Sequence, residues 1–334
     1  MSSAPPPEEI WKDARWLAQA VDPRAGLTRL VEMTPGDYRA SSFLDDRMLQ
    51  QQHRVTHLLP WGNVASFVPA DARRDARWIF HISHVGSTLI ARLMGELDGI
   101  LSIREPRALR DLTFFPEDVR ARFIPTLQAL FSRTFEANGS ALVKATSFVS
   151  EIAGELIPEG QRALFLFATP SSFISGILAG ENSRKELAGR AEQRTGRLVA
   201  RGVKLPAARS EADLAAAAWA CEMAALESAD GPNVRWADFD LVLGDLEGFL
   251  RDLADFFGFA ATPERLAEIA NGPLTRRYSK ATEYEYSPGL RRQLIAEAAR
   301  EHHSDIESAL AMLDAASETA PLLRKALDRA NAES

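Results

Sequence analysis

This chain of 334 residues has a single cysteine, fewer basic than acidic residues and few long apolar runs. The single cysteine, Cys221, excludes an internal disulfide framework and any zinc site built from several cysteines. It lies in the alanine-rich run AAAWACEMAAL, where we expect a small buried residue in a helix rather than a nucleophile. The formal net charge of -7 argues against general nucleic-acid binding, which requires a basic face to neutralise phosphates.

Signals for a membrane are missing as well. The opening residues, MSSAPPPEEIWKDARW, contain no apolar core of the kind that a secretory signal requires. No window reaches the roughly 18 consecutive apolar residues of a membrane span. We therefore predict a cytoplasmic protein without a membrane or nucleic-acid partner.

Strand and helix patterns alternate from residue 76 onward. Short apolar runs predict strands over 76–83, 99–105, 140–146, 162–169 and 233–240. Helical patterns lie between them, among them a long one over 116–138. Strands that alternate with helices form a parallel sheet covered on both faces. The predicted fold class is therefore α/β, a three-layer parallel sheet of about five strands flanked by helices.

The chain divides into four predicted regions. Residues 1–8 are rich in proline and serine and are expected to be disordered. Residues 9–70 form a helical or irregular extension packed on the core, with a helix over 10–21. The α/β domain spans 71–305, and an alanine-rich helical tail follows over 306–334. Neither end offers a core of its own, which favours one domain with peripheral helices.

The segment HISHVGSTLIARL, residues 81–93, resembles a phosphate-binding loop that leads into a helix. Such a turn needs exposed backbone N–H groups, a glycine that lets the backbone approach the phosphate, and hydroxyls on the first helical turn. Gly86, Ser87 and Thr88 supply these directly after a predicted strand. The nucleotide-triphosphate signature is not met, because Ser87 stands where lysine belongs and no leading glycine is present. A plain helix cap is the alternative interpretation.

A family resemblance emerges from the order and spacing of several segments across residues 76–300. The chain resembles the sulfotransferase family in HISHVGSTLIARL, SIREPRALRDL, LVKATSFVSEIAGELIPEGQRALFLFATPSSFISGILA and VRWADFDLVLGDLEGFLRDLADFFGF. The resemblance implies a P-loop NTPase-like sulfotransferase fold. It also implies in-line, metal-free transfer of a sulfuryl group from 3′-phosphoadenosine 5′-phosphosulfate (PAPS) to a hydroxyl or amine of a small-molecule acceptor.

The resemblance maps the 5′-phosphosulfate loop to His84, Val85, Gly86, Ser87 and Thr88. The loop N–H groups and the two hydroxyls would hold the 5′-phosphate. The family usually carries lysine or arginine where His84 stands, to stabilise charge on the bridging oxygen. A protonated imidazole beside a phosphate can supply that charge. His84 is therefore either a transition-state cation or a simple hydrogen-bond donor to phosphate.

The acceptor's proton requires a base. Many family members place a histidine where this chain has Thr146, so no base is expected there. Other branches use a glutamate after the second strand, and Glu105 stands at that strand's carboxyl end, where open α/β sheets bind ligands. Arg104 and Arg107 flank it and are expected to keep it ionised or to bind an acidic substrate. A surface Glu–Arg cluster is the alternative.

The site for the 3′-phosphate departs from the family pattern, because Ala168 replaces the family's arginine. Ser175 matches the family's downstream serine, displaced by one position. Compensating contacts are expected from a basic stretch that contains Arg276, Arg277 and Lys280. Arginine forks suit phosphate oxygens. A solvated basic loop is the alternative interpretation.

Three functions remain open from the sequence. The first is a PAPS-dependent sulfotransferase that uses Glu105 as base and no metal. The second is a P-loop phosphotransferase, which the missing lysine and the lack of a clear magnesium-holding aspartate disfavour. The third is a non-catalytic, nucleotide-binding relative on the same fold, since His84, Thr146 and Ala168 each depart from the family pattern. The histidine pair in EHHSD, residues 301–305, is interpreted as solvated rather than metal-binding.

Overall fold

The structure is a computed structural model that describes residues 4–51, 53–276 and 288–332. Its centre is a parallel sheet of five strands in the order β5-β6-β4-β7-β8. The strands are β4 (Arg77–His81), β5 (Ile100–Arg104), β6 (Ser140–Lys144), β7 (Ala163–Phe167) and β8 (Val234–Asp238). Each lies within one of the five predicted strand ranges, which confirms the predicted α/β fold class. Every residue of β7 is buried, as expected for a strand inside a covered parallel sheet.

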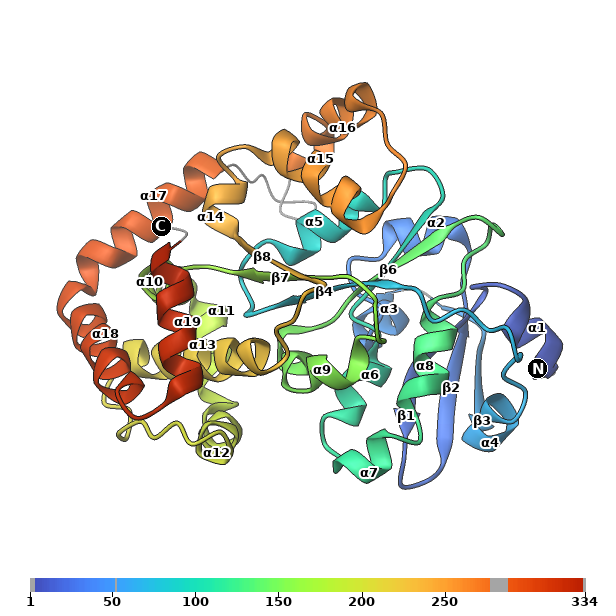
Figure 1. Cartoon of the computed structure of the whole chain (residues 1–334), viewed down its shortest axis with the longest axis horizontal. Coiled ribbons are helices and arrows are strands. Elements are labelled where there is room, and N and C mark those ends of the chain that lie inside the picture. Colours follow the sequence, from blue (N-terminus) through green and yellow to red (C-terminus); the bar gives the residue numbers. More distant parts are fainter. Residues whose placement is uncertain (1–3, 52, 277–287, 333–334) are drawn as a thin grey trace.

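Helices cover both faces of this sheet (Figure 1). One layer contains α5 (Ser87–Met94), α15 (Leu246–Phe257) and α16 (Pro263–Ala270). The opposite layer contains α8 (Ile124–Phe131), α9 (Ala153–Leu156) and α13 (Glu211–Ser228). The predicted three-layer arrangement is therefore confirmed. Between the layers the stacked rings of Trp78 and Phe80 form part of the core.

The remaining helices lie around these layers. They are α1 (Pro7–Lys12), α2 (Pro35–Ala40), α3 (Asp46–Gln51), α4 (Trp61–Ala65), α6 (Arg107–Leu112), α7 (Glu117–Arg120), α10 (Pro170–Leu178), α11 (Glu181–Ala188), α12 (Ala191–Ala200), α14 (Phe239–Val242), α17 (Pro288–Glu301), α18 (His303–Ser317) and α19 (Pro321–Ala332), with 3-10 turns at η1 (Ser147–Ile152) and η2 (Pro273–Arg276). The long helix expected over 116–138 is instead the two helices α7 and α8, because Pro125 starts a new helix.

No helix in the described ranges has the length and apolarity to cross a bilayer.

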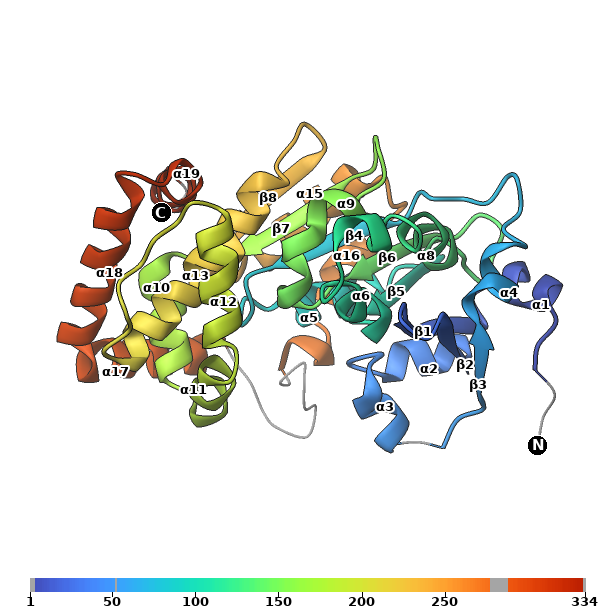
Figure 2. The same cartoon turned by 90° about the horizontal axis from the view of Figure 1, so that it is seen from below.

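The N-terminal region contains a second sheet rather than the helix predicted over 10–21. Strands β1 (Trp16–Asp22), β2 (Leu27–Glu32) and β3 (Thr56–Pro60) form an antiparallel sheet at one end of the molecule, opposite the C-terminal helices (Figure 2). The prediction was wrong because residues 16–21 are all buried, as α6 and α8 pack against β1. A short strand buried on both faces shows no alternation that separates it from a helix.

Helix α13 is the centre of the helical end of the molecule. It packs against α10, α12, α18 and α19. Cys221 on α13 is buried, and burial raises the pKa of its thiol to about 12. The prediction of a small buried residue is confirmed. At the surface of this end, His303 contacts Glu307 with both side chains exposed.

A buried ion pair links α12 to α13. Nη2 of Arg194 donates to Oε1 of Glu222 at 3.1 Å, and both side chains are buried. Burial raises the pKa of the Glu222 carboxyl to about 7, against the lowering effect of Arg194. A carboxyl whose folded-state pKa is raised binds more protons in the folded than in the unfolded chain. Its stabilising contribution is therefore full below about pH 4.5 and is lost as the pH rises through about 7.

Replacing Glu222 by glutamine removes this titration. We expect the difference in free energy of unfolding between wild type and Glu222→Gln to fall by about 2 kcal/mol from about pH 5 to about pH 8. Urea denaturation at the two pH values measures the difference. Glu211→Gln, a change at the exposed start of the same helix, serves as the control and should show no such trend. A pH-independent difference for Glu222→Gln would contradict the prediction.

Candidate active site

The carboxyl ends of β4, β5 and β6 open onto one cavity of about 310 Å³. His81 ends β4, Glu105 directly follows β5, and Thr146 lies two residues after β6; all three line the cavity. The N-terminal region also contributes, through Arg47 on α3, and the turn between α11 and α12 contributes Arg190. Side chains from distant parts of the chain therefore meet where open α/β sheets bind ligands.

The loop between β4 and α5 holds three residues in the left-handed region. The φ angles are +72° at Ser83, +52° at His84 and +61° at Gly86. Such a conformation turns neighbouring backbone N–H groups to one side and makes a concave site for anions. Gly86 also packs directly against Phe239, since a Cβ there would lie 1.9 Å from the Phe239 ring. The loop therefore has the backbone geometry of an anion-binding turn that leads into α5.

The predicted loop residues take different positions in this structure. His84 lines the cavity beside Ser83. Val85 is buried, so only its backbone faces the loop. Ser87 and Thr88 are buried on the first turn of α5, and the Thr88 Oγ1 accepts a hydrogen bond from Lys144 Nζ at 3.4 Å.

Glu105 lies at the cavity with a strained backbone and two cationic partners. Its φ is +53°, and its N–H donates to Lys144 O at 2.7 Å, which extends the β5–β6 pairing by one residue. The carboxylate receives hydrogen bonds from Lys144 Nζ and from Arg47 Nη2, the latter at 3.3 Å. A non-glycine residue is held at positive φ only where its surroundings compel it. The structure thus places the predicted base at the site as one member of a charge cluster.

Lys144 is the residue that sequence reasoning missed. Its side chain is 1% exposed, and its ammonium bridges Glu105 and Thr88. A lysine that ends a strand of the parallel sheet was the available signal, because buried lysines are rare unless paired. Arg47 had no signal in the sequence, since α3 is distant from β5 in the chain and only the fold brings it to Glu105. Its guanidinium also binds Asp45, at 2.7 Å.

Arg104 does not flank Glu105 as predicted. Successive residues of a strand point to opposite faces, so Arg104 at the end of β5 points away from the cavity. It is buried and donates hydrogen bonds to Tyr38 O and, at 2.6 Å, to Ser41 O, at the carboxyl end of α2. Burial lowers the pKa of its guanidinium to about 9. Its role is to hold α2 against β5.

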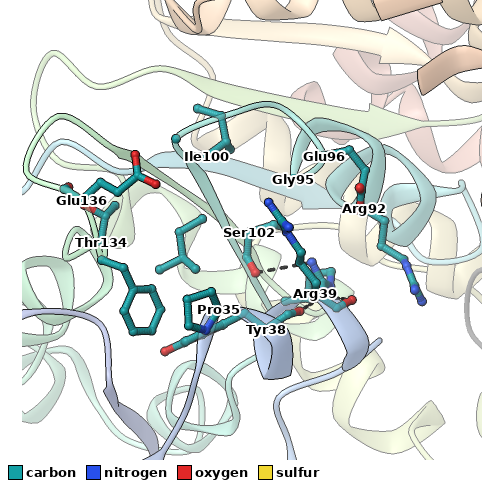
Figure 3. A pocket seen from close by; sticks show the side chains of 14 residues that line it. Pro35, Tyr38, Arg39, Arg92, Gly95, Glu96, Ile100, Ser102, Thr134 and Glu136 are labelled. Atoms are coloured by element: carbon teal, nitrogen blue, oxygen red, sulfur yellow. Dashed lines mark hydrogen bonds between the residues drawn. The ribbon is translucent and has the colours of Figure 1, made fainter. Parts of the chain in front are cut away.

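A small hollow of about 90 Å³ surrounds this contact between α2, the end of α5 and the edge strand β5. Figure 3 shows Tyr38, Arg39 and Ser102 grouped around it, with Glu96 and Arg92 on the side of α5. None of its lining residues is shared with the cavity at Glu105. The hollow is too small for a nucleotide, which needs several hundred Å³.

Hydrogen bonds fix the orientation of His81 at the base of the loop. The Ser83 N–H donates to its Nδ1 at 3.0 Å. Nε2 then carries the hydrogen and donates to Ala145 O at 3.0 Å. His81 therefore connects the loop to the end of β6 and positions Ser83 rather than offering a proton to the cavity.

The predicted contacts for a 3′-phosphate are not brought together in the described residues. The Ser175 hydroxyl is buried and donates to Ser171 O at 2.8 Å within its own helix. Arg276 ends η2, and its side chain lies outside the described residues, as do Arg277 and Lys280. Arg291 lies on the β7–β8 side of the loop, paired with Asp240 and over the ring of Phe239.

Comparison with known proteins finds similarity among solved structures. No family model matches the chain, and no curated protein matches it. Among solved structures the chain is similar to the "Sulfotransferase Domain from the Curacin Biosynthetic Pathway", with 13% sequence identity and a TM-score of 0.38. The match covers 65% of this chain and 86% of that chain. The function is therefore inferred from the residues of the cavity.

Proposed function

We propose that this chain is a sulfotransferase that uses PAPS and transfers its sulfuryl group to a hydroxyl or amine of a small molecule. The observation that supports this most directly is the buried Lys144 at the end of β6. Its ammonium contacts both Glu105, which follows β5, and Thr88 on α5. It places a cation, a carboxylate and an anion-binding loop within one site. These are the groups that metal-free transfer between a phosphate leaving group and a hydroxyl requires.

The residues present fit the phosphosulfate end of PAPS. The N–H groups of the loop from Ser83 to Thr88 would hold the 5′-phosphate, with α5 adding the partial positive charge of its N-terminus. When bound, PAPS supplies a sulfuryl group whose transfer leaves negative charge on the departing phosphate oxygen. Lys144 would stabilise that charge from beneath the loop. It therefore takes the role that the family resemblance gave to His84, which leaves His84 as a donor to phosphate.

Glu105 would accept the proton of the acceptor hydroxyl. One carboxylate oxygen contacts Lys144 and the other contacts Arg47. The same contacts hold the carboxylate in place at the cavity. Arg47 acts as a positioning residue here, because it contacts Glu105 and Asp45 rather than the reacting atoms.

Binding of the product nucleotide tests the proposal. We expect 3′-phosphoadenosine 5′-phosphate (PAP) to raise the melting temperature of the wild type, with about 2.7 kcal/mol of stabilisation at 100 times its Kd. ATP with magnesium should stabilise much less, because the loop lacks the lysine that grips outer phosphates. Differential scanning fluorimetry measures both.

A glutamine at position 105 separates binding from chemistry. We expect Glu105→Gln to keep PAP binding and to lower the release of PAP from PAPS by about 100-fold or more, across a panel of hydroxylated and aminated acceptors. Glu211→Gln changes an exposed carboxylate that does not line this cavity and is the control. Stabilisation by neither nucleotide would refute the proposal, and stabilisation by ATP with magnesium alone would favour a phosphotransferase. PAP binding without turnover in the wild type on any acceptor would favour a non-catalytic relative.

A further inference from the structure

The cavity beside Glu105 is lined by charged rather than apolar side chains. Only Phe43 and Pro106 of its described lining are large and apolar, and the guanidinium of Arg47 covers the Phe43 ring at 3.6 Å. An apolar molecule here would desolvate charged groups without offering them partners. The remaining lining is mainly polar, and its charged members are Arg47, Arg107, Arg110, Arg190, Asp45, Asp46, Glu105 and Glu186.

Two of the four arginines are each paired with two carboxylates of the protein. Arg47 binds Asp45 at 2.7 Å and also reaches Glu105. Arg107 binds Asp46 at 2.5 Å and Asp111 at 3.0 Å. Their charges are therefore compensated within the fold.

The other two arginines are different. Arg110 lies one helical turn after Arg107 on α6, on the same side of the helix, and within the described ranges it forms no salt bridge and its side chain donates no hydrogen bond. Arg190 lies at the turn between α11 and α12, where its guanidinium rests 4.8 Å from the centre of the Phe148 ring. In the described structure Nη2 of Arg190 forms an ion pair with Oε1 of the exposed Glu186, at 3.9 Å.

These two guanidiniums line the same cavity from different elements, and both retain N–H donors. The anion-binding loop and Lys144 already account for the donor phosphate in the proposed function. A guanidinium binds a carboxylate or phosphate through two parallel hydrogen bonds, which makes it specific for such groups. Arg110 and Arg190 are therefore suited to an anionic group on the acceptor.

We propose that the acceptor is a hydroxylated small molecule with a carboxylate or phosphate group, which Arg110 and Arg190 bind while the hydroxyl reaches Glu105. This inference rests on the proposed sulfotransferase function for the identity of the reacting group, although the anion site can be tested separately. It assigns the cavity to polar, negatively charged acceptors rather than to apolar alcohols or phenols.

Matched pairs of molecules test the anion site. Glucose is compared with glucuronate and glucose 6-phosphate, which differ from it at one carbon, and 4-hydroxybenzyl alcohol is compared with 4-hydroxybenzoate. Isothermal titration calorimetry, with and without PAP, measures binding to the wild type, to Arg110→Gln/Arg190→Gln and to each single variant. Arg122→Gln is the control, because that arginine, two residues after α7, is 74% exposed and does not line the cavity.

We expect at least one anionic molecule to bind the wild type about 10-fold to 100-fold more tightly than its neutral counterpart. The double variant should lose this preference, and each single variant should lose part of it. The affinity for PAP should stay within about twofold in all variants. The carboxylate and phosphate members of the glucose series then show which anion is preferred.

Three results would overturn the inference. The first is equal binding of the anionic and neutral molecules, or no binding of either, and the second is an unchanged preference for the anion in the double variant. The third is a parallel loss of PAP affinity, which would assign the two arginines to the donor. Failure of PAP to bind the wild type, with an anion preference that the double variant abolishes, would refute the sulfotransferase proposal. The anion site would stand in that case.

Discussion

Replacing Gly86 by alanine is expected to lower the free energy of unfolding by about 3 kcal/mol and to abolish stabilisation by PAP. Two costs combine. An L-residue at a φ of +61° costs about 1–2 kcal/mol, and an atom forced into a packed region costs about 1–3 kcal/mol. The new Cβ would lie 1.9 Å from the buried ring of Phe239, so the ring or the loop must move. Urea denaturation and PAP thermal shifts measure the two effects.

Gly160→Ala provides the matched control. Gly160 has a similar positive φ of +76°, but a Cβ there meets nothing within 4 Å. This variant should show only the backbone cost of about 1–2 kcal/mol and should bind PAP like the wild type. Adding Phe239→Leu to Gly86→Ala should recover part of the lost stability by making space for the methyl group. Equal losses in Gly86→Ala and Gly160→Ala would show that the contact with Phe239 is unimportant.

Replacing Lys144 by methionine is expected to lower the free energy of unfolding by about 3 kcal/mol, because it leaves the carboxylate of Glu105 without its buried partner. The same change should abolish transfer from PAPS, since Lys144 is the cation that contacts both Glu105 and Thr88. Chemical denaturation and the release of PAP from PAPS are the measurements.

The double variant Lys144→Met/Glu105→Met distinguishes pairing from packing. Removing both charges eliminates the uncompensated carboxylate, so about 2 kcal/mol of the stability should return, while activity stays lost. A double variant no more stable than Lys144→Met would mean that the lysine acts through its packing. Transfer that persists in Lys144→Met would refute its assignment as the cation that stabilises the leaving group.

The N-terminal region was the part least accessible to prediction, because it forms an antiparallel sheet where a helical or irregular extension was expected. Residues 16–21 are apolar except for Gln19, and such a short run fits a buried helix and a buried strand equally well. These residues form a strand because they pair with β2 in the antiparallel sheet. The consequence reaches the site, because this region brings Arg47 to the carboxylate of Glu105 from 58 positions away in the chain.

The sequence by itself determined the alternation of five strands with helices, the loop that precedes α5, and the position of Glu105 at the end of a strand. These follow from local patterns of apolar residues and from the glycine and hydroxyl residues of one short segment. Only the tertiary structure decided which charges meet. It pairs Glu105 with Lys144, 39 positions away, and turns Arg104 toward α2. Such pairings depend on strand order and on the direction in which each side chain leaves its strand, and neither is a property of a local segment.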